Sequence, residues 1–332
     1  MPEITVIIPA FNAERTLVRT VASVTEQTIH DIEVIIVDDG SADSTGAIAD
    51  RLANSDERVK VIHQANAGCY AARLAGMKKA KSPYFGFVDA DDFIDARMYE
   101  HLLRFAKDNQ LDIAQCDWFG HRRNNGVPQI FGTREEVVSQ VILPRLVEGV
   151  DSMMVWDKVY RNHYDFSKWP EGMFATHEDL VHNFMLFEKA SRVGYLNEEL
   201  YHYNITNASS TRNFSFSRIA ALENTIRIRR ELIVRLGIGD CRKEDACWVV
   251  KNIRNGIVAA SAGTAGTMAE RKKNVRGLLD VPELEDAIRS LHGTVTGSIR
   301  FIRCFSVLPL GLAISGFRLM KGISRLMSAL AL

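Results

Sequence analysis

The first hundred residues repeat one pattern, in which a short apolar run is followed by a segment whose apolar residues recur every three or four positions. The short runs predict buried strands, and the periodic segments predict amphipathic helices. Strands that alternate with helices through short links form a layered α/β sheet. The expected strands cover 4–10, 32–39, 58–63 and 84–89. The expected helices begin behind an Asn12 N-cap, at Ser44, at Gly68 and behind an Asp95 cap.

The periodicity is clear up to about residue 116, and the remainder of the chain is less regular. Residues 117–133 have the pattern of a strand, a polar turn at 124–126 and a second strand, which predicts a hairpin. The segments 216–236 and 244–262 have helical periodicity. The chain therefore combines an α/β sheet with helices towards its C-terminus.

Composition and charge argue against several broad classes. Lys plus Arg equals Asp plus Glu at 41 each, so the net charge gives no reason to expect a nucleic-acid partner. The five cysteines form no CxxC pair, and the first residues lack the basic and apolar regions of a secretory leader. The longest apolar stretch, 304–317, is interrupted by Pro309, whereas a membrane span needs roughly 20 apolar residues. The expected location is cytoplasmic.

Two pairs of aspartates follow two of the expected strands. Asp38 and Asp39 end the second strand, and Asp89 and Asp91 end the fourth. Ligands of open α/β sheets bind beyond the carboxyl ends of the strands, so both pairs are expected at one rim. Crowded carboxylates repel one another unless a cation or hydrogen-bond donors lie between them. Mg²⁺ or Mn²⁺ held by few carboxylates takes its other ligands from water and phosphates, which indicates a nucleoside diphosphate site.

Both clusters also have a structural interpretation. Asp, Gly and Ser suit turns, so residues 38–41 can be a turn without further function. A helix N-cap needs one side chain, and Asp92 or Asp95 can supply it for the helix that follows. Capping therefore explains Asp92 or Asp95 but leaves Asp89 and Asp91 unexplained.

Four ordered blocks resemble the successive motifs of family-2 glycosyltransferases: "VIIPAFNAERTLVRTVASVTEQT", "EVIIVDDGSADST", "NAGCYAARLAG" and "YFGFVDADDFID". Ordered blocks are far more specific than a lone D-x-D. The resemblance continues more thinly through "MMVWDKVYRN", "THEDLVHNF" and "LYHYNITNASST". It implies a GT-A fold, a Rossmann-like mixed α/β sheet flanked by helices. It also implies transfer of a sugar from a nucleotide-diphosphate sugar to a hydroxyl group.

The resemblance assigns the first two blocks to nucleotide binding. Pro9 and Phe11 belong to the first block, and the ring of Phe11 is implied to stack near the base. Phe11 stands where the family more often has tyrosine, so the aromatic face remains while the hydroxyl is absent. Asp39, supported by Asp38, is implied to meet the edge of uracil or another base, and UDP-sugar is the expected donor.

The resemblance assigns the next two blocks to the ribose and the metal. Asp89 is implied to meet the ribose and to lie beside the metal, and Asp91 is implied to bind the Mn²⁺ or Mg²⁺ that bridges the diphosphate. Arg73 matches an arginine often found in the third block, but Leu74 replaces the asparagine that commonly follows it. An arginine on a helix face without a role in the site is therefore the alternative for Arg73.

Asp179 is implied to be the general base, and the adjacent Glu178 is the alternative. Such a base takes the proton of the acceptor hydroxyl during attack opposite the leaving nucleotide, which gives an inverting single displacement. General bases contribute roughly 10²- to 10⁴-fold in rate. The resemblance also places Trp156 and Lys158 near the acceptor. His177 is either a hydrogen-bonding neighbour of the base or a loop histidine.

The expected domains are a catalytic domain, 1–215, and a helical C-terminal region, 216–332. Residues 1–115 would be the nucleotide-sugar half and 116–215 the acceptor half. From Ala287 onward the chain has six basic and no acidic residues. Arg318, Lys321 and Arg325 would share one face of an interfacial helix. This predicts peripheral attachment to the cytoplasmic face of the inner membrane. The alternative is that the tail packs on the protein or on a second subunit. Together with the family resemblance, such a tail implies a glycan or lipid-linked glycan acceptor in polysaccharide synthesis.

Other functions fit the motifs less well. A haloacid-dehalogenase-like phosphohydrolase uses a D-x-D with Mg²⁺, but normally on its first strand, and it has no role for Asp38, Asp39 or Asp179. A dehydrogenase needs G-x-G-x-x-G where this chain has "PAFNAER", and a nucleotidyltransferase needs a Gly-rich basic loop there. A non-catalytic, membrane-associated sugar-nucleotide-binding protein would be expected to lack the acidic residues, yet Asp89, Asp91 and Asp179 are all present.

Overall fold

The computed structural model describes residues 1–120, 127–144, 154–170, 178–204, 216–262, 266–291 and 297–318. Four parallel strands form the first half of its sheet, and all four were expected from the sequence. They are β1 (Ile4–Ala10), β2 (Ile32–Asp38), β3 (Val59–His63) and β4 (Tyr84–Phe87), in the spatial order β3-β2-β1-β4. Every residue of β1 is buried, as expected for a central parallel strand covered on both faces. The carboxyl ends of these strands therefore meet at one rim.

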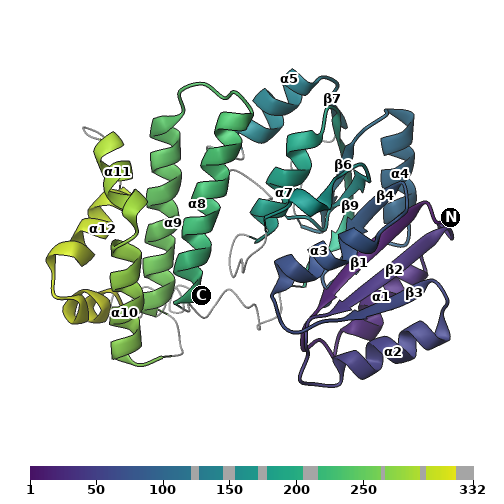
Figure 1. Cartoon of the computed structure of the whole chain (residues 1–332), viewed down its shortest axis with the longest axis horizontal. Helices are drawn as coiled ribbons and strands as arrows, with labels where there is room; N and C mark the ends of the chain where they lie inside the picture. The colour runs from purple at the N-terminus through teal and green to yellow at the C-terminus, as the bar shows by residue number, and fades with distance from the viewer. Residues whose placement is uncertain are drawn as a thin grey trace, which may run out of the picture. The chain divides into compact units, whose positions relative to one another are not determined.

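Helices connect the parallel strands and cover the sheet (Figure 1). They are α1 (Leu17–Thr25), α2 (Thr45–Ser55), α3 (Cys69–Lys79) and α4 (Met98–Asp108). Right-handed crossovers from β1 to β2 to β3 put α1 and α2 on one face, and the return from β3 to β4 puts α3 on the other. The start of α3 at the Gly68 N-cap confirms the sequence prediction.

Two predicted caps are wrong. The structure begins α1 at Leu17 with Thr16 as its N-cap, whereas Asn12 has φ 51° and joins the end of β1 to the next loop. There the Asn12 Oδ1 accepts a hydrogen bond of 2.9 Å from the N–H of Ala42. Helix α4 begins at Met98, and the carboxylate of Asp95 accepts the N–H of Arg97 in the turn before it. For α1 and α4, local sequence places the turn correctly but not the first helical residue.

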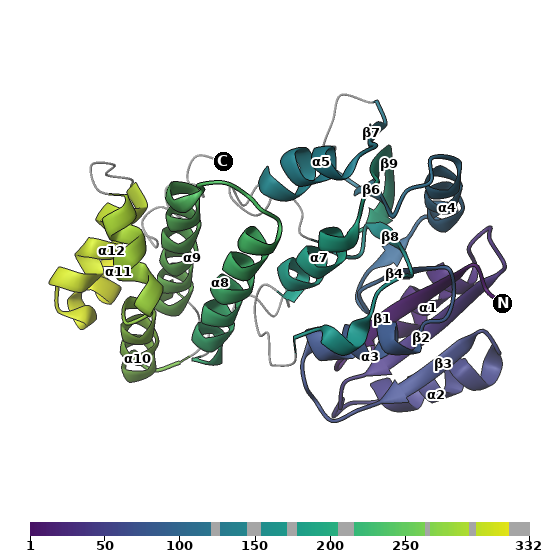
Figure 2. The ribbon, with the colours of Figure 1, turned by 45° about the horizontal axis from the view of Figure 1, so that its top comes forward.

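The second half of the sheet is mixed (Figure 2). Strand β8 (Lys158–Arg161) runs antiparallel to both β4 and β6 (Ile113–Trp118), and β9 (Val193–His202) runs parallel to β6. The predicted hairpin at 117–133 is wrong, because β7 (Gln129–Phe131) pairs with β9 rather than with β6. The short strand β5 (Phe93–Ile94) pairs with the far end of β9. Helix α7 (Glu178–Lys189) precedes β9 and contacts α3.

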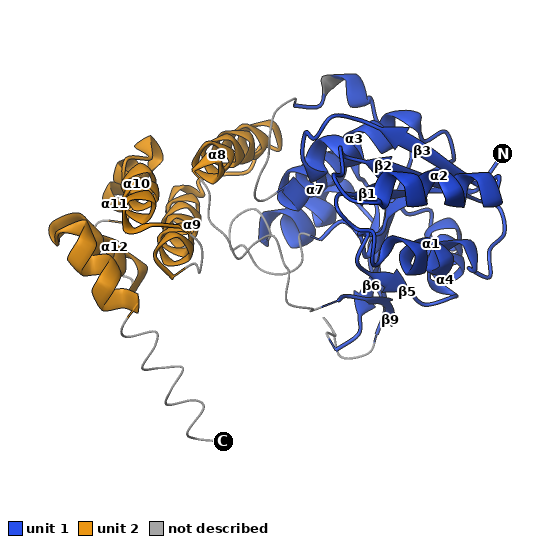
Figure 3. Cartoon of the chain, turned by 90° about the horizontal axis from the view of Figure 1, so that it is seen from below, with its two compact units in different colours: residues 1–144, 151–205 blue, residues 145–150, 206–332 orange. Residues whose placement is uncertain are grey.

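The chain forms two compact units (Figure 3). Unit 1 comprises 1–144 and 151–205 and contains the sheet, and unit 2 comprises 145–150 and 206–332. Unit 2 is helical, with α8 (Ser217–Arg235), α9 (Arg242–Ala262), α10 (Met268–Leu279), α11 (Pro282–Ser290) and α12 (Gly297–Val307). Within it, buried Arg229 pairs with Asp245 and lies 4.9 Å from the ring centre of Trp248. In the part of the chain that the structure describes, no helix combines the length and apolarity that crossing a bilayer requires.

Candidate active site

The rim formed by β1, β2 and β4 carries the residues predicted to bind the nucleotide. Pro9 is buried within β1 opposite Val37, and Phe11 follows the strand with its side chain 52% exposed. An exposed phenylalanine at the end of a buried strand offers an aromatic face to a ligand. Asp38 ends β2, and Asp39 and Gly40 form the turn after it. The structure therefore brings the residues of the first two blocks to one edge.

The carboxylate of Asp39 fixes the start of α3. It accepts hydrogen bonds from the side chain of Gln64 at 2.7 Å and from the N–H groups of Ala67 and Gly68 at 2.9 and 2.8 Å. Gly40 has φ +69°, and a Cβ there would lie 2.7 Å from the backbone nitrogen of Asn66. Only glycine suits this turn. Recognition of a base edge by Asp39 remains a prediction, and Oδ2 carries one of these three hydrogen bonds.

Asp38 stabilises the same turn from the side. Its carboxylate accepts the N–H of Ser41 at 3.1 Å and lies 3.0 Å from Nδ1 of His63. Burial alone would raise the pKa of Asp38, but the hydrogen bonds with Ser41 and His63 outweigh it and lower the pKa. His63 also lies 3.0 Å from Asp50, and the two carboxylates raise the pKa of its imidazole. Asp38 therefore stays ionised, and it supports Asp39 through the turn.

Arg73 joins the two halves of the site. The guanidinium projects from α3, is only 2% exposed, donates to Asp89 at 2.8 Å and forms an ion pair with Asp179. It lies 5.9 Å from the ring centre of Phe87, the last residue of β4. Burial disfavours its charge, but Asp179 and the other neighbouring acids raise its pKa. Arg73 is therefore a buried side chain paired with two predicted site residues, and its role in the site remains a prediction.

Asp179 lies in the first turn of α7 with its side chain 21% exposed. Its Oδ1 receives Arg73, and within the described part of the chain no donor occupies Oδ2. Burial, with added repulsion from Glu178 and Asp89, raises the pKa of Asp179 to about 7 despite the opposing charge of Arg73. A carboxylate whose pKa lies near neutrality, with one oxygen held and one open, suits a general base. Arg73 contacts Asp179 and not Glu178.

The turn after β4 presents Asp89 and Asp91. The side chain of Asp89 is 26% exposed, and Asp91 is an exposed residue. Partial desolvation and the negative charge of Asp89 raise the pKa of Asp91. The backbone oxygen of Asp91 accepts hydrogen bonds from Arg19 at 2.8 Å and from Asn204 at 3.1 Å. The turn is held through its backbone, and the Asp91 carboxylate faces solvent.

Asp92 and Tyr201 are a buried pair beneath this turn. The Tyr201 hydroxyl donates to Asp92 at 2.7 Å and accepts the N–H of Asp89 at 3.2 Å. Asp92 also accepts the N–H of Asn204 at 2.7 Å. Burial, with repulsion from Asp89, raises the pKa of Asp92 to about 7. The proposed helix cap at Asp92 is therefore wrong, because its carboxylate connects the turn to β9.

Sequence reasoning did not single out Tyr201, Tyr203 or His182. Both tyrosines lie in the Tyr-rich segment "LYHYN", but only the three-dimensional pairing of β9 with β5 shows that they reach the aspartate turn. His182 is fully buried, with its ring centre 4.3 Å from that of Tyr70, and burial followed by the charge of Arg73 lowers its pKa well below the usual range. Its Nδ1 lies 3.1 Å from the backbone oxygen of Glu178, so a neutral imidazole supports the first turn of α7.

Two residues of the thinner blocks are interior. Trp156 is 1% exposed and stacks on Tyr201, with ring centres 4.0 Å apart. Lys158 is fully buried, and its amine contacts Asp157 at 2.5 Å. Neither side chain is open to solvent, so we expect them to support the acceptor region through their neighbours rather than by direct contact. His177 lies outside the described residues.

Asp89 and Asp91 suit a cation that brings most of its own ligands. The described residues contain no group of three or more His, Cys, Asp or Glu side chains that would form an all-protein metal site. The exposed carboxylate of Asp91 has a raised pKa, partly because the negative charge of Asp89 lies beside it. A cation would stabilise this pair of carboxylates. Mg²⁺ and Mn²⁺ accept such sites when phosphates and water complete the coordination.

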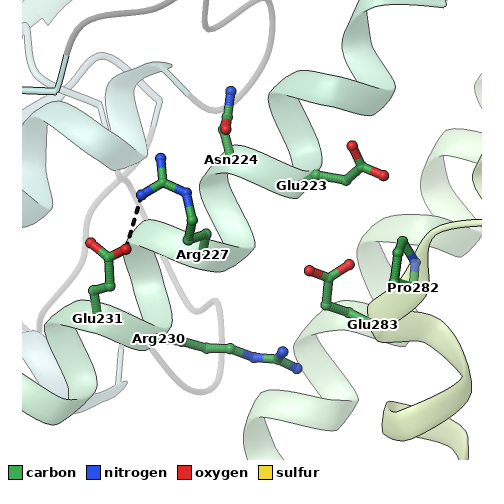
Figure 4. A pocket seen from close by; sticks show the side chains of 7 residues that line it. All are labelled: Glu223, Asn224, Arg227, Arg230, Glu231, Pro282 and Glu283. Atoms are coloured by element: carbon green, nitrogen blue, oxygen red, sulfur yellow. Dashed lines mark hydrogen bonds and ion pairs between the residues drawn. The ribbon is translucent and has the colours of Figure 1, made fainter.

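The described part of unit 2 contains two hollows, both of which include charged side chains. One, of about 470 Å³, is lined by Glu223, Asn224, Arg227, Arg230, Glu231, Pro282 and Glu283 (Figure 4). Its charges have both signs, and Arg227 and Glu231 pair at 2.9 Å. The other, of about 440 Å³, includes Ile233, Ile238 and Ala287. Neither contains a residue of the four sequence blocks.

The carboxyl ends of the parallel strands carry two aspartate turns, and a buried arginine joins one turn to a carboxylate on a later helix. This arrangement is typical of the ligand-binding rim of an α/β protein. The model of glycosyl transferase family 2 matches residues 5–177. The chain belongs to this family and is a glycosyltransferase with a GT-A fold.

Named relatives agree with this assignment. The uncharacterized glycosyltransferase EpsJ of Bacillus subtilis is 28% identical over 300 residues, which cover 87% of each chain. The glycosyltransferase GlyA of Streptococcus pneumoniae is 31% identical over 246 residues, 71% of this chain and 35% of GlyA. Residues 1–349 of S. aureus TarS, solved in complex with UDP-GlcNAc, have the same fold with a TM-score of 0.62, 17% identity and coverage of 92% of this chain and 91% of that one.

Proposed function

We propose that the protein transfers a sugar from a UDP-sugar to a hydroxyl of a glycan or lipid-linked glycan by an inverting single displacement. The observation that carries the proposal is the contact of Arg73 with both Asp89 and Asp179. It connects the turn expected to hold the donor diphosphate with the carboxylate expected to activate the acceptor. The fold shared with TarS, which was solved with UDP-GlcNAc, supports a uridine nucleotide donor.

The chain's own residues divide the work along the rim. Phe11 offers its exposed ring to the base, and Asp39 offers acceptor oxygens to the base edge. Asp179 takes the proton of the acceptor hydroxyl at Oδ2 while Arg73 holds Oδ1. The acceptor oxygen forms its bond to the anomeric carbon as the bond from that carbon to the diphosphate oxygen breaks. The electron pair leaves with the nucleoside diphosphate, and configuration at the anomeric carbon inverts.

Asp91, with Asp89 beside it, would hold a Mn²⁺ or Mg²⁺ ion. When bound, such an ion stabilises the negative charge that develops on the departing diphosphate. Arg73 has a separate role, because it neutralises the inner carboxylates whether or not a cation occupies the exposed one.

The test is calorimetric binding of UDP, GDP, dTDP and CDP, each with and without Mn²⁺. We expect UDP to bind in a metal-dependent manner to the wild type and at least 10-fold more weakly to Asp91→Ala. Asp95→Ala is the matched control, because Asp95 lies in the same region but is engaged with Arg97. Failure of all four diphosphates to bind folded protein would refute the donor site.

The alternative functions lose support at the same rim. A haloacid-dehalogenase-like phosphohydrolase would carry its D-x-D on the first strand, whereas Asp89 and Asp91 follow β4. Family membership and the named glycosyltransferase relatives favour an enzyme over a non-catalytic binding protein.

We also propose peripheral attachment to the cytoplasmic face of a membrane through the C-terminal region. The end of α12 and the residues after it expose Val307, Leu308 and Leu312 at 82%, 50% and 68%. Arg300 and Arg303 are exposed on the same helix, and each basic residue near an anionic surface contributes about 1 kcal/mol. Lys321 and Arg325 of the predicted interfacial face lie outside the described residues. The test is co-sedimentation of the protein with anionic and with zwitterionic vesicles. Sedimentation with anionic vesicles alone, reduced in an Arg300→Glu, Arg303→Glu variant, would support attachment. A protein that sediments with neither kind of vesicle would refute it.

A further inference from the structure

The exposed ring of Tyr203 lies on a rigid aromatic stack beside the aspartate turn. Its side chain is 44% exposed, whereas Trp156 and Tyr201 beneath it are 1% and 0% exposed. The ring centres of Tyr203 and Trp156 are 5.7 Å apart with their planes at 9°, and those of Trp156 and Tyr201 are 4.0 Å apart at 20°. The orientation of the exposed ring is therefore set by buried neighbours.

Hydrogen bonds on either side of Tyr203 fix its position relative to the reacting groups. Tyr201 bridges Asp92 and the N–H of Asp89, at 2.7 and 3.2 Å. Asn204 donates its N–H to Asp92 at 2.7 Å and its side-chain amide to the backbone oxygen of Asp91 at 3.1 Å. Tyr201, two residues before the ring, and Asn204, the residue after it, are thus both tied to the turn expected to hold the donor diphosphate.

The surroundings of the ring are acidic. Burial first, and then the negative charges of Asp92, Asp91, Asp89 and Asp179, raise the pKa of the Tyr203 phenol. The hydrogen bonds of the adjacent Asn204 to Asp92 and to the backbone of Asp91 hold Tyr203 beside the aspartate turn. A pyranose presents a C–H face that packs on an aromatic ring and hydroxyls that donate to carboxylates, so this surface matches a sugar on both counts.

The order of the strands separates Tyr203 from the nucleotide. The base is expected at the ends of β1 and β2, whereas Tyr203 follows β9, which lies beyond β4, β8 and β6 in the sheet. A nucleotide-sugar runs from base through diphosphate to sugar, so the ring lies at the reacting end. The proposed reaction brings the acceptor hydroxyl to this end of the site, and an exposed aromatic face there suits the partner that arrives from solvent.

We infer that Tyr203 is a stacking platform for a pyranose ring of the acceptor. The inference rests on the proposed function and assigns to Tyr203 the recognition of a sugar ring of its glycan acceptor. The donor sugar is the other source of a pyranose at this end of the site, and the experiment separates the two.

The test compares the wild type with Tyr203→Ala, Tyr203→Leu and Tyr203→Phe, each saturated with UDP. Binding of methyl α- and β-pyranosides of glucose, galactose, mannose, rhamnose, GlcNAc and GalNAc is measured by saturation-transfer NMR. We expect at least one pyranoside to bind the wild type, with a Kd at least 10-fold higher in Tyr203→Ala and Tyr203→Leu. Tyr203→Phe keeps the aromatic face and should stay within 3-fold.

Phe119→Ala is the matched control. Phe119 is 47% exposed but stacks on His202, at a ring-centre distance of 3.7 Å, on the side of β9 opposite the stack of Trp156 with Tyr201 and Tyr203. Its removal should leave pyranoside binding unchanged. An equal loss in Phe119→Ala would overturn the inference, as would a UDP-bound wild type that takes none of the pyranosides.

A second measurement addresses the donor. The affinities of UDP, UDP-glucose, UDP-galactose and UDP-GlcNAc are compared in wild type and Tyr203→Ala. If the variant loses affinity for a UDP-sugar but not for UDP, the ring serves the donor and the acceptor assignment is wrong. If the wild type does not bind UDP at all, the proposed function itself fails.

Discussion

Replacing Arg73 with glutamine should move the pH dependence of the enzyme. Arg73 is almost fully buried between Asp89 and Asp179, and it opposes the effect of burial on the pKa of Asp179, which lies at about 7. Without the guanidinium, the negative charge of Asp89 acts on Asp179 with no cation between them. The pKa of Asp179 should therefore rise, and this proposed base should be protonated at neutral pH.

The size of the effect follows from the geometry. Opposite charges about 4 Å apart at an effective dielectric constant near 20 interact by roughly 4 kcal/mol, which corresponds to about three pH units. The Asp179 side chain is 21% exposed, and solvent screening reduces this to about one or two units. The base must be deprotonated to act, so the acidic limb should move from about 7 to about 8 or 9. At pH 7.5 the rate should fall roughly 3- to 25-fold and recover as the pH rises.

The assay is the pH profile of kcat/KM for turnover of a UDP-sugar, with thermal unfolding measured alongside. Arg229→Gln is the control, because it also removes a buried arginine paired with an aspartate, but in unit 2. It should lower the Tm without moving the acidic limb. A folded Arg73→Gln enzyme whose acidic limb stays at the wild-type position would refute the reasoning.

Three further substitutions, one of them with a matched glycine control, test other contacts. Burial raises the pKa of Asp92 to about 7, so the wild type loses stability as the pH rises from about 4 through 7 and this carboxyl ionises. Asp92→Asn removes that ionisation and should raise the Tm relative to wild type by about 2 °C or more at pH 8 but not at pH 5. Gly40→Ala should destabilise by roughly 1–3 kcal/mol and weaken UDP binding, because the new Cβ meets Asn66 at a positive φ. Gly237→Ala, with φ +63° and no atom within 4 Å, should cost only about 1–2 kcal/mol and leave UDP binding unchanged. Phe11→Ala should weaken UDP binding several-fold by removing the exposed aromatic face, as measured by calorimetry.

The sequence predicts the parallel half of the sheet well because its signals are local. Strands buried on both faces appear as unbroken apolar runs, as β1 and β2 do, and Gly68 marks the start of α3 correctly. The aspartates at the strand ends follow directly from these assignments. Their arrival at one rim is a property of parallel strands and needs no knowledge of side-chain contacts.

What the sequence does not predict depends on contacts between distant segments. Arg73 is separated by 106 positions from Asp179, and no local pattern distinguishes it from a surface arginine. The roles of Asp92 and Tyr201 depend on the pairing of β5 with β9. The predicted hairpin at 117–133 is wrong because β7 also pairs with β9. Strand partners in a mixed sheet are chosen by tertiary packing, which single-sequence patterns do not record.

The long strand β9 ties the proposed nucleotide and acceptor halves of unit 1 together. Its first residues pair with β6 and β7, and its last residues pair with β5 and hold the turn of Asp89 and Asp91 through Tyr201 and Asn204. A fragment ending near residue 115 would contain every motif of the nucleotide half and yet leave that turn without its support. The nucleotide half is therefore not a module that can be excised or grafted. Exchanging acceptor halves between relatives would have to preserve the end of β9 for donor binding to survive.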